Sequence, residues 1–302
     1  MDKKTLKRKK IGVLMGGKSS EREISLKSGT AILQSLLRMG YNAVGIDAGD
    51  RLIATLMQKT IEIAFISLHG RWGEDGTVQG LCELMGIPYT GSGVLGSSIA
   101  MDKTIMKHIL MGLQIPTPPY AVFTQKSKIQ FPLPFVVKPA NEGSTIGISI
   151  VQTNKEKNRA IQQAFAYDKK ILIERYIDGP EITVGIVNGR LLPIIEVRPS
   201  TGFYDFKAKY TQGMTEYIIP ATISKRVERT AYAIASTIYE SFELSGCVRI
   251  DMLVDKATPQ VIDINTSPGM TETSLVPKAW GYLGKTFDEL VEELLMGAQV
   301  KL

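Results

Sequence analysis

Two stretches near the C-terminus, residues 248–254 and 260–264, alternate apolar and polar side chains. This alternation is the period of a half-buried β-strand, and the Pro-containing segment 255–259 between them predicts a hairpin. If that segment is the whole loop, Val254 lies opposite Gln260. One face of the hairpin is apolar and is predicted to join a core: Ile250, Met252, Val254, Ile262 and Ile264.

The other face of the hairpin carries two carboxylates. The same register sets Asp251 opposite Asp263 and Arg249 opposite Asn265. Opposed carboxylates on neighbouring strands repel each other, and a bound cation removes that repulsion. An all-oxygen set of two Asp and one Asn suits a hard ion such as Mg²⁺. The alternative is the solvated outer face of an ordinary hairpin.

The bulk properties are those of a globular chain. Its 302 residues predict about two or three domains. It is 44% hydrophobic and 22% charged, and no apolar run approaches the roughly 18 residues of a membrane span. Cys82 and Cys247 lack metal or redox spacing, which favours a reducing cytoplasm.

Most of the net charge lies at the start of the chain. Residues 1–10 hold six basic residues and one acidic residue, which accounts for five of the six net positive charges. A short solvated N-terminus is the favoured interpretation, and a nucleic-acid-binding patch is the alternative.

The N-terminal third has the rhythm of an open parallel α/β sheet. Strands are expected at residues 11–15, 41–46 and 61–68, with a helix at 20–39 between the first two. Ligands of such a sheet gather at the carboxyl ends of its strands. His69 follows the third strand, where it could fix the loop or line a pocket.

Residues 12–19, GVLMGGKS, match the P-loop pattern. In a true P-loop the four residues between the glycines wrap around phosphate, whereas here Val13, Leu14 and Met15 are predicted to be the strand itself. A P-loop NTPase that uses Lys18 therefore stays as a rival interpretation.

The middle of the chain offers a second phosphate site. A strand at residues 133–138 ends in Lys138, a Gly/Ser-rich segment spans 140–147, and a return strand follows at 148–151. Small residues let a backbone approach phosphate oxygens closely. Lys103 lies in the first turns of a helix expected at 99–111, after a small-residue segment that suggests a domain boundary.

Further along, Glu174 and Glu181 flank a turn between two strands. They could accept hydrogen bonds from an adenine amino group and a ribose hydroxyl, or they could be two solvated turn residues. Residues 199–215 are rich in Gly, aromatics and lysines without a clear period, as in a lid loop. Helices are expected at 224–242 and 286–296.

Taken together, these motifs resemble the D-alanine–D-alanine ligase family of the ATP-grasp superfamily. The segments that carry the resemblance cover nearly the whole chain in the family's order: GGKSSEREISLKSG, LHGRWGEDGTVQG, GSGVLGSSIAMDK, VVKPANEGSTIG, FYDFKAKY and IDINTSPGMTETSLVP. The resemblance implies an α/β fold, α+β in its ATP-grasp part. An N-terminal open parallel sheet domain at 1–91 would precede a central ATP-grasp domain at 92–178. A C-terminal ATP-grasp domain at 179–302 would carry the metal site and the lid loop, and the two ATP-grasp domains would clamp ATP.

The resemblance also assigns residues to ligands. ATP phosphates would meet Lys103, Lys138 and Lys209, and the adenosine would meet Glu174, Ile177 and Glu181. Two Mg²⁺ ions, or Mn²⁺, would be held by Asp251, Asp263 and Asn265. The first D-alanine would meet Glu21 and His69, and the second would meet Lys209 and Ser274. Glu21, Ser144 and Tyr210 would form a hydrogen-bonded group, and Arg249 and the Gly269 N–H would stabilise the oxyanion.

The implied reaction joins two D-alanines through a D-alanyl phosphate and releases ADP and phosphate, for peptidoglycan precursor synthesis. The family suggests a cytoplasmic homodimer that needs neither nucleic acid nor a membrane. Tyr210 favours a dipeptide product over a depsipeptide. Asp263 stands where the family usually has Glu, and Trp72 lies in a loop that is commonly smaller. Another ATP-grasp carboxylate–amine ligase remains an alternative.

Overall fold

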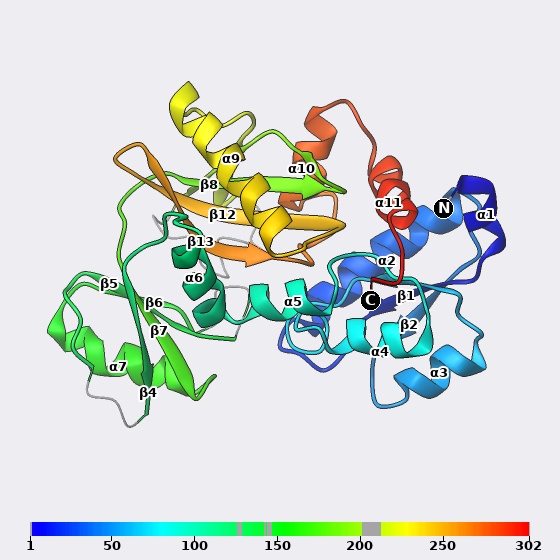
Figure 1. Cartoon of the computed structure of the whole chain (residues 1–302), viewed down its shortest axis with the longest axis horizontal. Coiled ribbons are helices and arrows are strands. Elements are labelled where there is room, and N and C mark those ends of the chain that lie inside the picture. Colours follow the sequence, from blue (N-terminus) through cyan, green and yellow to red (C-terminus); the bar gives the residue numbers. More distant parts are fainter. Residues whose placement is uncertain (1, 126–128, 142, 144–146, 201–212, 302) are drawn as a thin grey trace.

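The structure, a computed structural model, describes residues 2–125, 129–141, 143, 147–200 and 213–301. Figure 1 shows the N-terminal elements at one end of the molecule and the helix α7 with its strands at the other. Each of the three sheets has its own layer of helices, and they are described in chain order below.

The first sheet is three-stranded and parallel, in the order β2–β1–β3. Its strands are β1 (Ile11–Met15), β2 (Ala43–Asp47) and β3 (Ile63–Ile66), and its helices are α2 (Arg22–Arg38), α3 (Leu52–Gln58) and α4 (Thr77–Met85). All residues of β1 and β3 are buried, as expected when helices cover both faces of a parallel sheet. The predicted open parallel sheet is confirmed.

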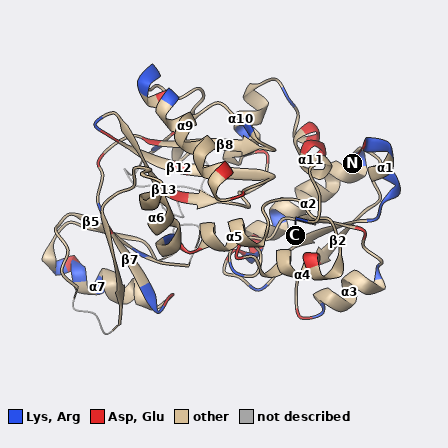
Figure 2. Cartoon of the chain, viewed as in Figure 1, with Lys and Arg blue, Asp and Glu red and all other residues tan. Residues whose placement is uncertain are grey.

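The basic N-terminus is solvated as predicted, with the exception of Leu6. It forms the helix α1 (Lys3–Arg8), capped by the Asp2 side chain, which accepts a hydrogen bond from the Thr5 N–H. Leu6 is fully buried, and Lys3 Nζ lies 2.6 Å from Glu292 Oε2 on the last helix, α11 (Phe287–Met296). Figure 2 shows α1 at the edge of the molecule, with its Lys and Arg positions in blue. The buried Leu6 and the Lys3–Glu292 ion pair both hold α1 against the rest of the chain.

The second sheet is four-stranded and antiparallel, in the order β4–β7–β5–β6. Its strands are β4 (Tyr120–Thr124), β5 (Phe135–Pro139), β6 (Ser149–Val151) and β7 (Lys170–Arg175). The helix α7 (Asn154–Phe165) begins with a capping box formed by Thr153 and Glu156 and packs its alanines against the sheet. The opposite face of this sheet is therefore left to form one wall of a site.

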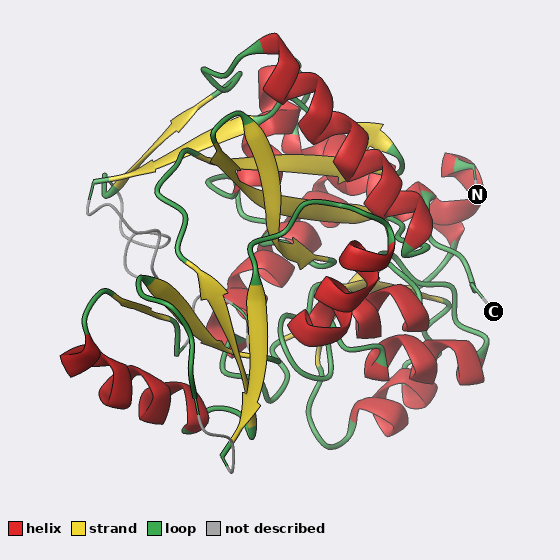
Figure 3. Ribbon diagram, turned by 60° about the vertical axis from the view of Figure 1, so that its left-hand side comes forward, coloured by secondary structure: helices red, strands yellow, loops and turns green. Residues whose placement is uncertain are grey.

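The third sheet is six-stranded, with the main order β11–β10–β8–β12–β13 and β9 paired to β8. Its strands are β8 (Glu181–Val187), β9 (Arg190–Leu191), β10 (Ile195–Pro199), β11 (Thr215–Ile218), β12 (Cys247–Asp255) and β13 (Thr258–Asn265). Figure 3 shows the long helix α9 (Lys225–Ser241) lying across this sheet. Apolar residues of α9 pack against Ile250, Met252 and Ile264, which joins the hairpin to a core as predicted.

One predicted helix is in fact two. Residues 99–111 were expected to be continuous, but α5 (Val94–Met101) ends before Asp102 and α6 (Lys103–Gly112) begins after it. Asp102 has an extended backbone, and its carboxylate accepts hydrogen bonds from the N–H groups of Thr104 and Ile105. This N-cap makes Lys103 the first residue of α6.

The cores do not follow the order of the chain. One cluster joins Leu6, Ile11 and Ile32 of the N-terminal part to Trp280 of the helix α10 (Leu275–Tyr282) and to Leu290 of α11. A second cluster packs α5 and α6 against the six-stranded sheet. The consecutive domain ranges 1–91, 92–178 and 179–302 remain a prediction. In the part of the chain that the structure describes, no helix is both long enough and apolar enough to cross a bilayer.

Candidate active site

The β12–β13 hairpin places the predicted acid pair as expected. Asp251 pairs with Asp263, and Arg249 pairs with Asn265. The predicted loop was wrong, however, because Asp255 pairs with Thr258 and the turn is shorter by several residues. A β-bulge between Asp251 and Met252 absorbs the one-residue difference, so the two errors cancel at the site.

The same bulge changes which residues of β13 join the core. Beyond it, Met252 pairs with Val261, which is fully buried. Ile262, predicted to be a core residue, is only partly buried and lines a cavity instead. A one-residue register shift moves a side chain to the other face of a sheet, which explains the exchange.

Cationic side chains of the chain accompany both acids. Arg249 donates from Nε and Nη2 to the two oxygens of Asp251, each at 2.8 Å, and the Thr183 hydroxyl donates to Asp251 Oδ1 at 2.6 Å. Lys103 Nζ lies 3.2 Å from Asp263 Oδ1. Burial by itself would lower the pKa of Lys103, but the charge of Asp263 and its hydrogen bond raise the pKa above its ordinary value.

A first cavity of about 430 Å³ lies between the four-stranded and six-stranded sheets. That volume is within the range of small-molecule sites. Its lining includes every described residue predicted to meet ATP, together with both acids of the hairpin: Lys103, Lys138, Glu174, Ile177, Glu181, Asp251 and Asp263. Lys209, the remaining residue predicted to meet ATP, lies outside the described residues.

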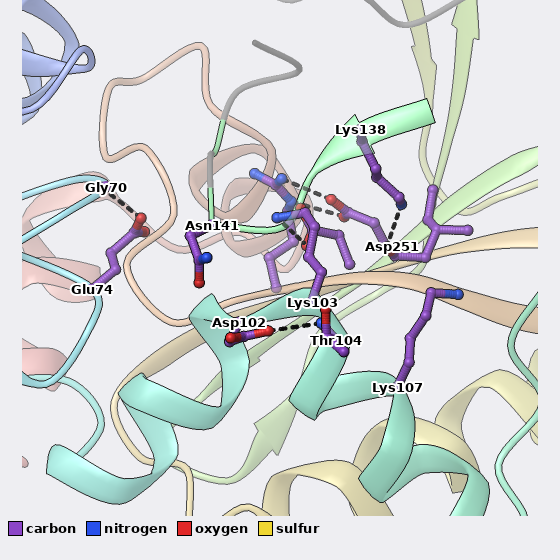
Figure 4. Close-up of polar contacts among 12 residues, drawn as sticks. Gly70, Glu74, Asp102, Lys103, Thr104, Lys107, Lys138, Asn141 and Asp251 are labelled. Carbon is purple, nitrogen blue, oxygen red and sulfur yellow. Dashed lines mark hydrogen bonds and ion pairs between the residues drawn. The ribbon is translucent and has the colours of Figure 1, made fainter. Parts of the chain in front are cut away.

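Glu174 forms the centre of a buried charge cluster on the wall of this cavity. Its Oε2 lies 2.8 Å from Lys107 Nζ, and its Oε1 forms an ion pair with Lys138. Lys138 also donates to the Ile262 carbonyl at 3.3 Å, which connects the two sheets. Figure 4 shows Lys103 and Lys107 on successive turns of α6, with Lys138 reaching toward them from β5. Burial would raise the pKa of Glu174, but the two lysines outweigh it and hold the pKa below its ordinary value.

A second cavity of about 740 Å³ adjoins the first. Its lining includes every described residue that was predicted to meet D-alanine or the oxyanion: Glu21, His69, Arg249, Gly269 and Ser274. The two cavities share three lining residues, Lys103, Gly143 and Asp263. The Lys103–Asp263 ion pair therefore lies where the cavities meet.

Two glycines allow close approach to the Glu21 carboxylate. A Cβ on Gly143 would lie 2.6 Å from Glu21 Oε2, and one on Gly70 would lie 2.9 Å from the same oxygen. Gly70 also has a φ of +68°, which most side chains avoid. Gly143 and Gly70 thus both lie close to one acid that lines the second cavity.

His69 both fixes a loop and lines the second cavity. Its Nδ1 lies 2.7 Å from the Ser267 carbonyl oxygen, so that nitrogen must carry the proton and donate it. Ser28 Oγ lies 3.4 Å from Nε2 and accepts a hydrogen bond from the Met270 N–H. Burial lowers the pKa of His69, against the opposing charge of Glu21, so the imidazole is neutral.

Ser274 is the N-cap residue of α10. Its Oγ accepts a hydrogen bond from the Thr271 N–H at 3.1 Å, and a Cβ on Gly269 would lie 3.1 Å from it. The helix N-terminus opens toward the second cavity, where Leu275 and Lys278 are also lining residues. A helix N-terminus with a nearby lysine favours an anion such as a carboxylate.

Sequence reasoning missed two buried charged residues. Glu74 lines the second cavity and accepts a hydrogen bond from the Gly70 N–H at 2.7 Å. Burial, followed by the charge of Glu21, raises the pKa of Glu74 well above its ordinary value. Lys107 is four residues after Lys103, a spacing that puts both on one face of α6 and could have revealed it.

Several predicted residues fall elsewhere. Ser144, Lys209 and Tyr210 lie outside the described residues. Lys18 forms an exposed ion pair with Asp50, and its Nζ lies 5.4 Å from the Trp72 ring centroid. Val13, Leu14 and Met15 are strand β1, as the argument against a P-loop required.

The acid pair suits a hard metal ion by its donor chemistry. Asp251 and Asp263 face each other across the hairpin, and Asn265 Oδ1 lies on the same strand as Asp263. Within the described ranges, no group of three or more His, Cys, Asp and Glu side chains could hold a metal ion. Two carboxylates and an amide fall outside that definition, so the predicted magnesium set stays a prediction that its all-oxygen chemistry fits.

Comparison with known proteins bears on the identity of the chain. A family model described as the D-ala D-ala ligase C-terminus matches residues 109–296, and one for the D-ala D-ala ligase N-terminus matches residues 50–92. D-alanine–D-alanine ligase of Syntrophotalea carbinolica is 50% identical over 304 residues and covers the full length of both chains. The same enzyme of Geotalea uraniireducens is 45% identical, with 98% of each chain covered.

Solved structures agree with the sequence matches. The crystal structure of Bacillus anthracis D-alanine–D-alanine ligase complexed with ATP has a TM-score of 0.84 and 34% identity. The match covers 96% of this chain and 97% of that chain. A second structure of that enzyme gives a TM-score of 0.85 and 35% identity over the same shares. The chain belongs to the D-alanine–D-alanine ligase family and is an enzyme that ligates D-alanine to D-alanine.

Proposed function

We propose that ATP binds in the first cavity, that the two D-alanines bind in the second, and that the phosphoryl group crosses between them at the Lys103–Asp263 junction. The shared wall of the two cavities carries this proposal. Phosphoryl transfer needs the attacking carboxylate and the γ-phosphate within contact distance, and two adjoining cavities with a lysine at their junction supply that arrangement.

The first cavity would hold both the adenosine and the phosphates of ATP. Glu174, the Ile177 backbone and Glu181 would hold the adenosine, and they lie together along the lining of the first cavity. Lys103 and Lys138 would meet the phosphates, with Lys209 of the lid loop as a third cation. A lysine ammonium acts as a compact point charge for phosphate oxygens.

The amino-acid site uses opposite charges at its two ends. Glu21 would accept the ammonium of the first D-alanine, with the neutral imidazole of His69 nearby. Ser274 at the N-terminus of α10 would receive the carboxylate of the second D-alanine, together with Lys209. Support comes from the positions of Glu21, His69 and Ser274 in the wall of one cavity. The group of Glu21, Ser144 and Tyr210 remains a proposal of the family resemblance.

Asp251, Asp263 and Asn265 would hold two Mg²⁺ or Mn²⁺ ions, which would neutralise the charge of the transferring phosphate. Asp263 stands where the family usually has Glu, so its carboxylate reaches one methylene less far from β13. Its place between the two cavities supports a role at the reacting phosphate rather than at the adenosine.

The reaction would proceed in two displacements. A carboxylate oxygen of the first D-alanine attacks the γ-phosphorus, the bond to the ADP oxygen breaks, and D-alanyl phosphate forms. The amine of the second D-alanine then attacks the acyl carbon, loses a proton, and phosphate leaves. Arg249 and the Gly269 N–H would stabilise the oxyanion of that second step.

The family resemblance also supports peptidoglycan precursor synthesis as the purpose of the dipeptide, a homodimer as the assembly and the cytoplasm as the place of action. Both cysteines are buried and unbridged, which fits a reducing compartment.

A phosphate-release assay tests the proposal. The purified enzyme with ATP and Mg²⁺ should release phosphate when D-alanine is added and should form D-alanyl-D-alanine in equal amount. L-alanine should give no release above background. Release with a different acid or amine, and none with D-alanine, would assign the chain to another ATP-grasp ligase activity.

A further inference from the structure

Lys107 is a fully buried lysine that lies behind the wall of the first cavity. Its Nζ lies 2.8 Å from Glu174 Oε2, yet it is not among the described residues that line either cavity. Lys138, the other partner of Glu174, does line the first cavity. One carboxylate is thus held between an accessible lysine and an inaccessible one.

The environment of Lys107 is specific for an ammonium group. Nζ donates to Thr117 Oγ1 at 2.6 Å and contacts the Pro118 carbonyl at 3.4 Å, and Thr117 in turn donates to the Val261 carbonyl at 2.7 Å. With Glu174, these contacts supply an acceptor for each of the three N–H donors of a lysine. The Tyr120 ring centroid lies 5.1 Å from the same nitrogen.

Burial of a charged lysine is unfavourable unless a specific partner offsets it. Burial lowers the pKa of Lys107 to about 8, against the opposing charge of Glu174. The cluster holds two lysines for one carboxylate, which is one more cation than the neutrality of Glu174 requires. That extra cation faces the cavity as Lys138.

We propose that Lys107 is a positioning residue for nucleotide binding, which keeps Glu174 paired from behind so that Lys138 can turn to the nucleotide phosphates. The inference rests on the proposed place of ATP in the first cavity. Without Lys107, Glu174 would have Lys138 as its one remaining lysine partner among the described residues, and a buried carboxylate would hold that lysine tightly.

This role predicts a loss of binding affinity that is large only for ligands with phosphates. Lys107→Met should weaken ATP binding by about tenfold or more, because Lys138 must leave an otherwise unpaired carboxylate to reach the phosphates. Adenosine has no phosphates and does not draw on Lys138, so its affinity should fall much less. The ratio of the ATP and adenosine dissociation constants is therefore the informative quantity.

A second change separates this role from a structural one. In the double variant Lys107→Met with Glu174→Gln, the carboxylate charge is gone and Lys138 is released. The ratio of the ATP and adenosine dissociation constants should then return toward the value of the parent enzyme. A distorted pocket would instead weaken both ligands together, and the double variant would not restore the ratio.

Lys301 provides a matched control. It is a partly buried lysine whose pKa is also lowered by burial to about 8, and its Nζ lies 3.6 Å from the Tyr89 ring centroid. It lies outside the described lining of both cavities. Lys301→Met should lower the melting temperature as Lys107→Met does, with no change in the ligand ratio.

Isothermal titration calorimetry with ATP and with adenosine, at one fixed Mg²⁺ concentration, gives the dissociation constants for the parent and the three variants. A fall in ATP affinity at least several times that in adenosine affinity, reversed in the double variant, is expected. Equal loss of both ligands, or no loss, would overturn the inference. If Lys107→Met does not fold, Lys107→Gln takes its place, since the amide can still donate to Thr117. Failure of the proposed function would appear separately, as a parent enzyme without D-alanine-dependent phosphate release.

Discussion

Two walls of the first cavity hold carboxylates in different surroundings. On the β5–β7 wall, formed by Lys138 and Glu174, the Glu174 side chain is 3% exposed and has Lys107 behind it. On the β12–β13 wall, the Asp251 side chain is 10% exposed and paired with Arg249, whereas the Asp263 side chain is 32% exposed. Charges in a dry wall interact strongly and are costly to unpair, whereas partly solvated charges exchange partners at little cost. The buried Glu174 is therefore suited to fixed recognition, and the partly solvated Asp263 to ions that bind and dissociate.

The largest effect is expected from removal of Glu174. Glu174→Met would leave two buried lysines without their carboxylate, so the free energy of unfolding should fall by about 3–5 kcal/mol. Urea denaturation of parent and variant measures it. A fall of under about 1 kcal/mol would show that the β5–β7 wall is not the dry, strongly coupled cluster described.

A comparable effect, on rate rather than stability, is expected at the β12–β13 wall. Arg249→Met should lower turnover by about 10²–10³-fold, because one oxyanion donor is lost. Arg38→Met is a suitable control, since Arg38 also pairs with a carboxylate, Asp288, outside the described lining of both cavities. Equal losses of turnover in the two variants would contradict the assigned role of Arg249.

A pH dependence of stability is expected from Lys107. The pKa of Lys107 is lowered from 10.5 to about 8, mainly by burial, so its protonated form destabilises the fold below pH 8. Above pH 8 the folded protein loses this proton before the unfolded chain does, and stability must rise. The free energy of unfolding of the parent, minus that of Lys107→Met, should grow by roughly 2 kcal/mol up to about pH 9.5. A flat difference would contradict a neutralised lysine.

A smaller stability effect is expected at the exposed acid. Asp263→Asn should change the free energy of unfolding by less than about 1 kcal/mol, because this ion pair is partly solvated. The Mg²⁺ concentration for half-maximal activity should nevertheless rise by about tenfold. Asp263→Glu, with its longer carboxylate, is the control and should retain activity. A large stability loss in Asp263→Asn would remove the contrast between the two walls.

The smallest effect is expected at the P-loop-like segment. Lys18 is exposed and pairs with Asp50 outside the described lining of both cavities, so Lys18→Ala should change stability by less than about 0.5 kcal/mol and leave ATP turnover intact. Lys138→Ala should abolish turnover. The reverse result would favour the P-loop interpretation and place the nucleotide at the first glycine turn.

The sequence predicted the acid pair better than the hairpin that carries it. The turn is shorter than expected because Lys256 and Ala257 both have positive φ, as in a two-residue hairpin turn. Such turns usually contain Asn-Gly or Asp-Gly, and this turn contains neither. The bulge beside Asp251 then restored the predicted pairing, which no local pattern indicated.

The residues that sequence reasoning missed depend on contacts between distant segments. Leu6 is buried against a helix near the other end of the chain, so α1 looked like a charged tail. Lys107 cannot be told from an ordinary helical lysine by sequence, because its partners Glu174 and Thr117 come from other segments. Alternation and glycine spacing revealed the sheets and the residues at strand ends, because those signals are local.

Transfer of an oxygen atom tests the central claim most directly. D-alanine labelled with ¹⁸O in its carboxylate, incubated with the enzyme, ATP and Mg²⁺, should yield released phosphate that carries one ¹⁸O atom per dipeptide formed. That result requires a carboxylate oxygen of D-alanine to attack the γ-phosphorus, which the two adjoining cavities would allow. Unlabelled phosphate alongside dipeptide formation would mean that no D-alanyl phosphate forms there.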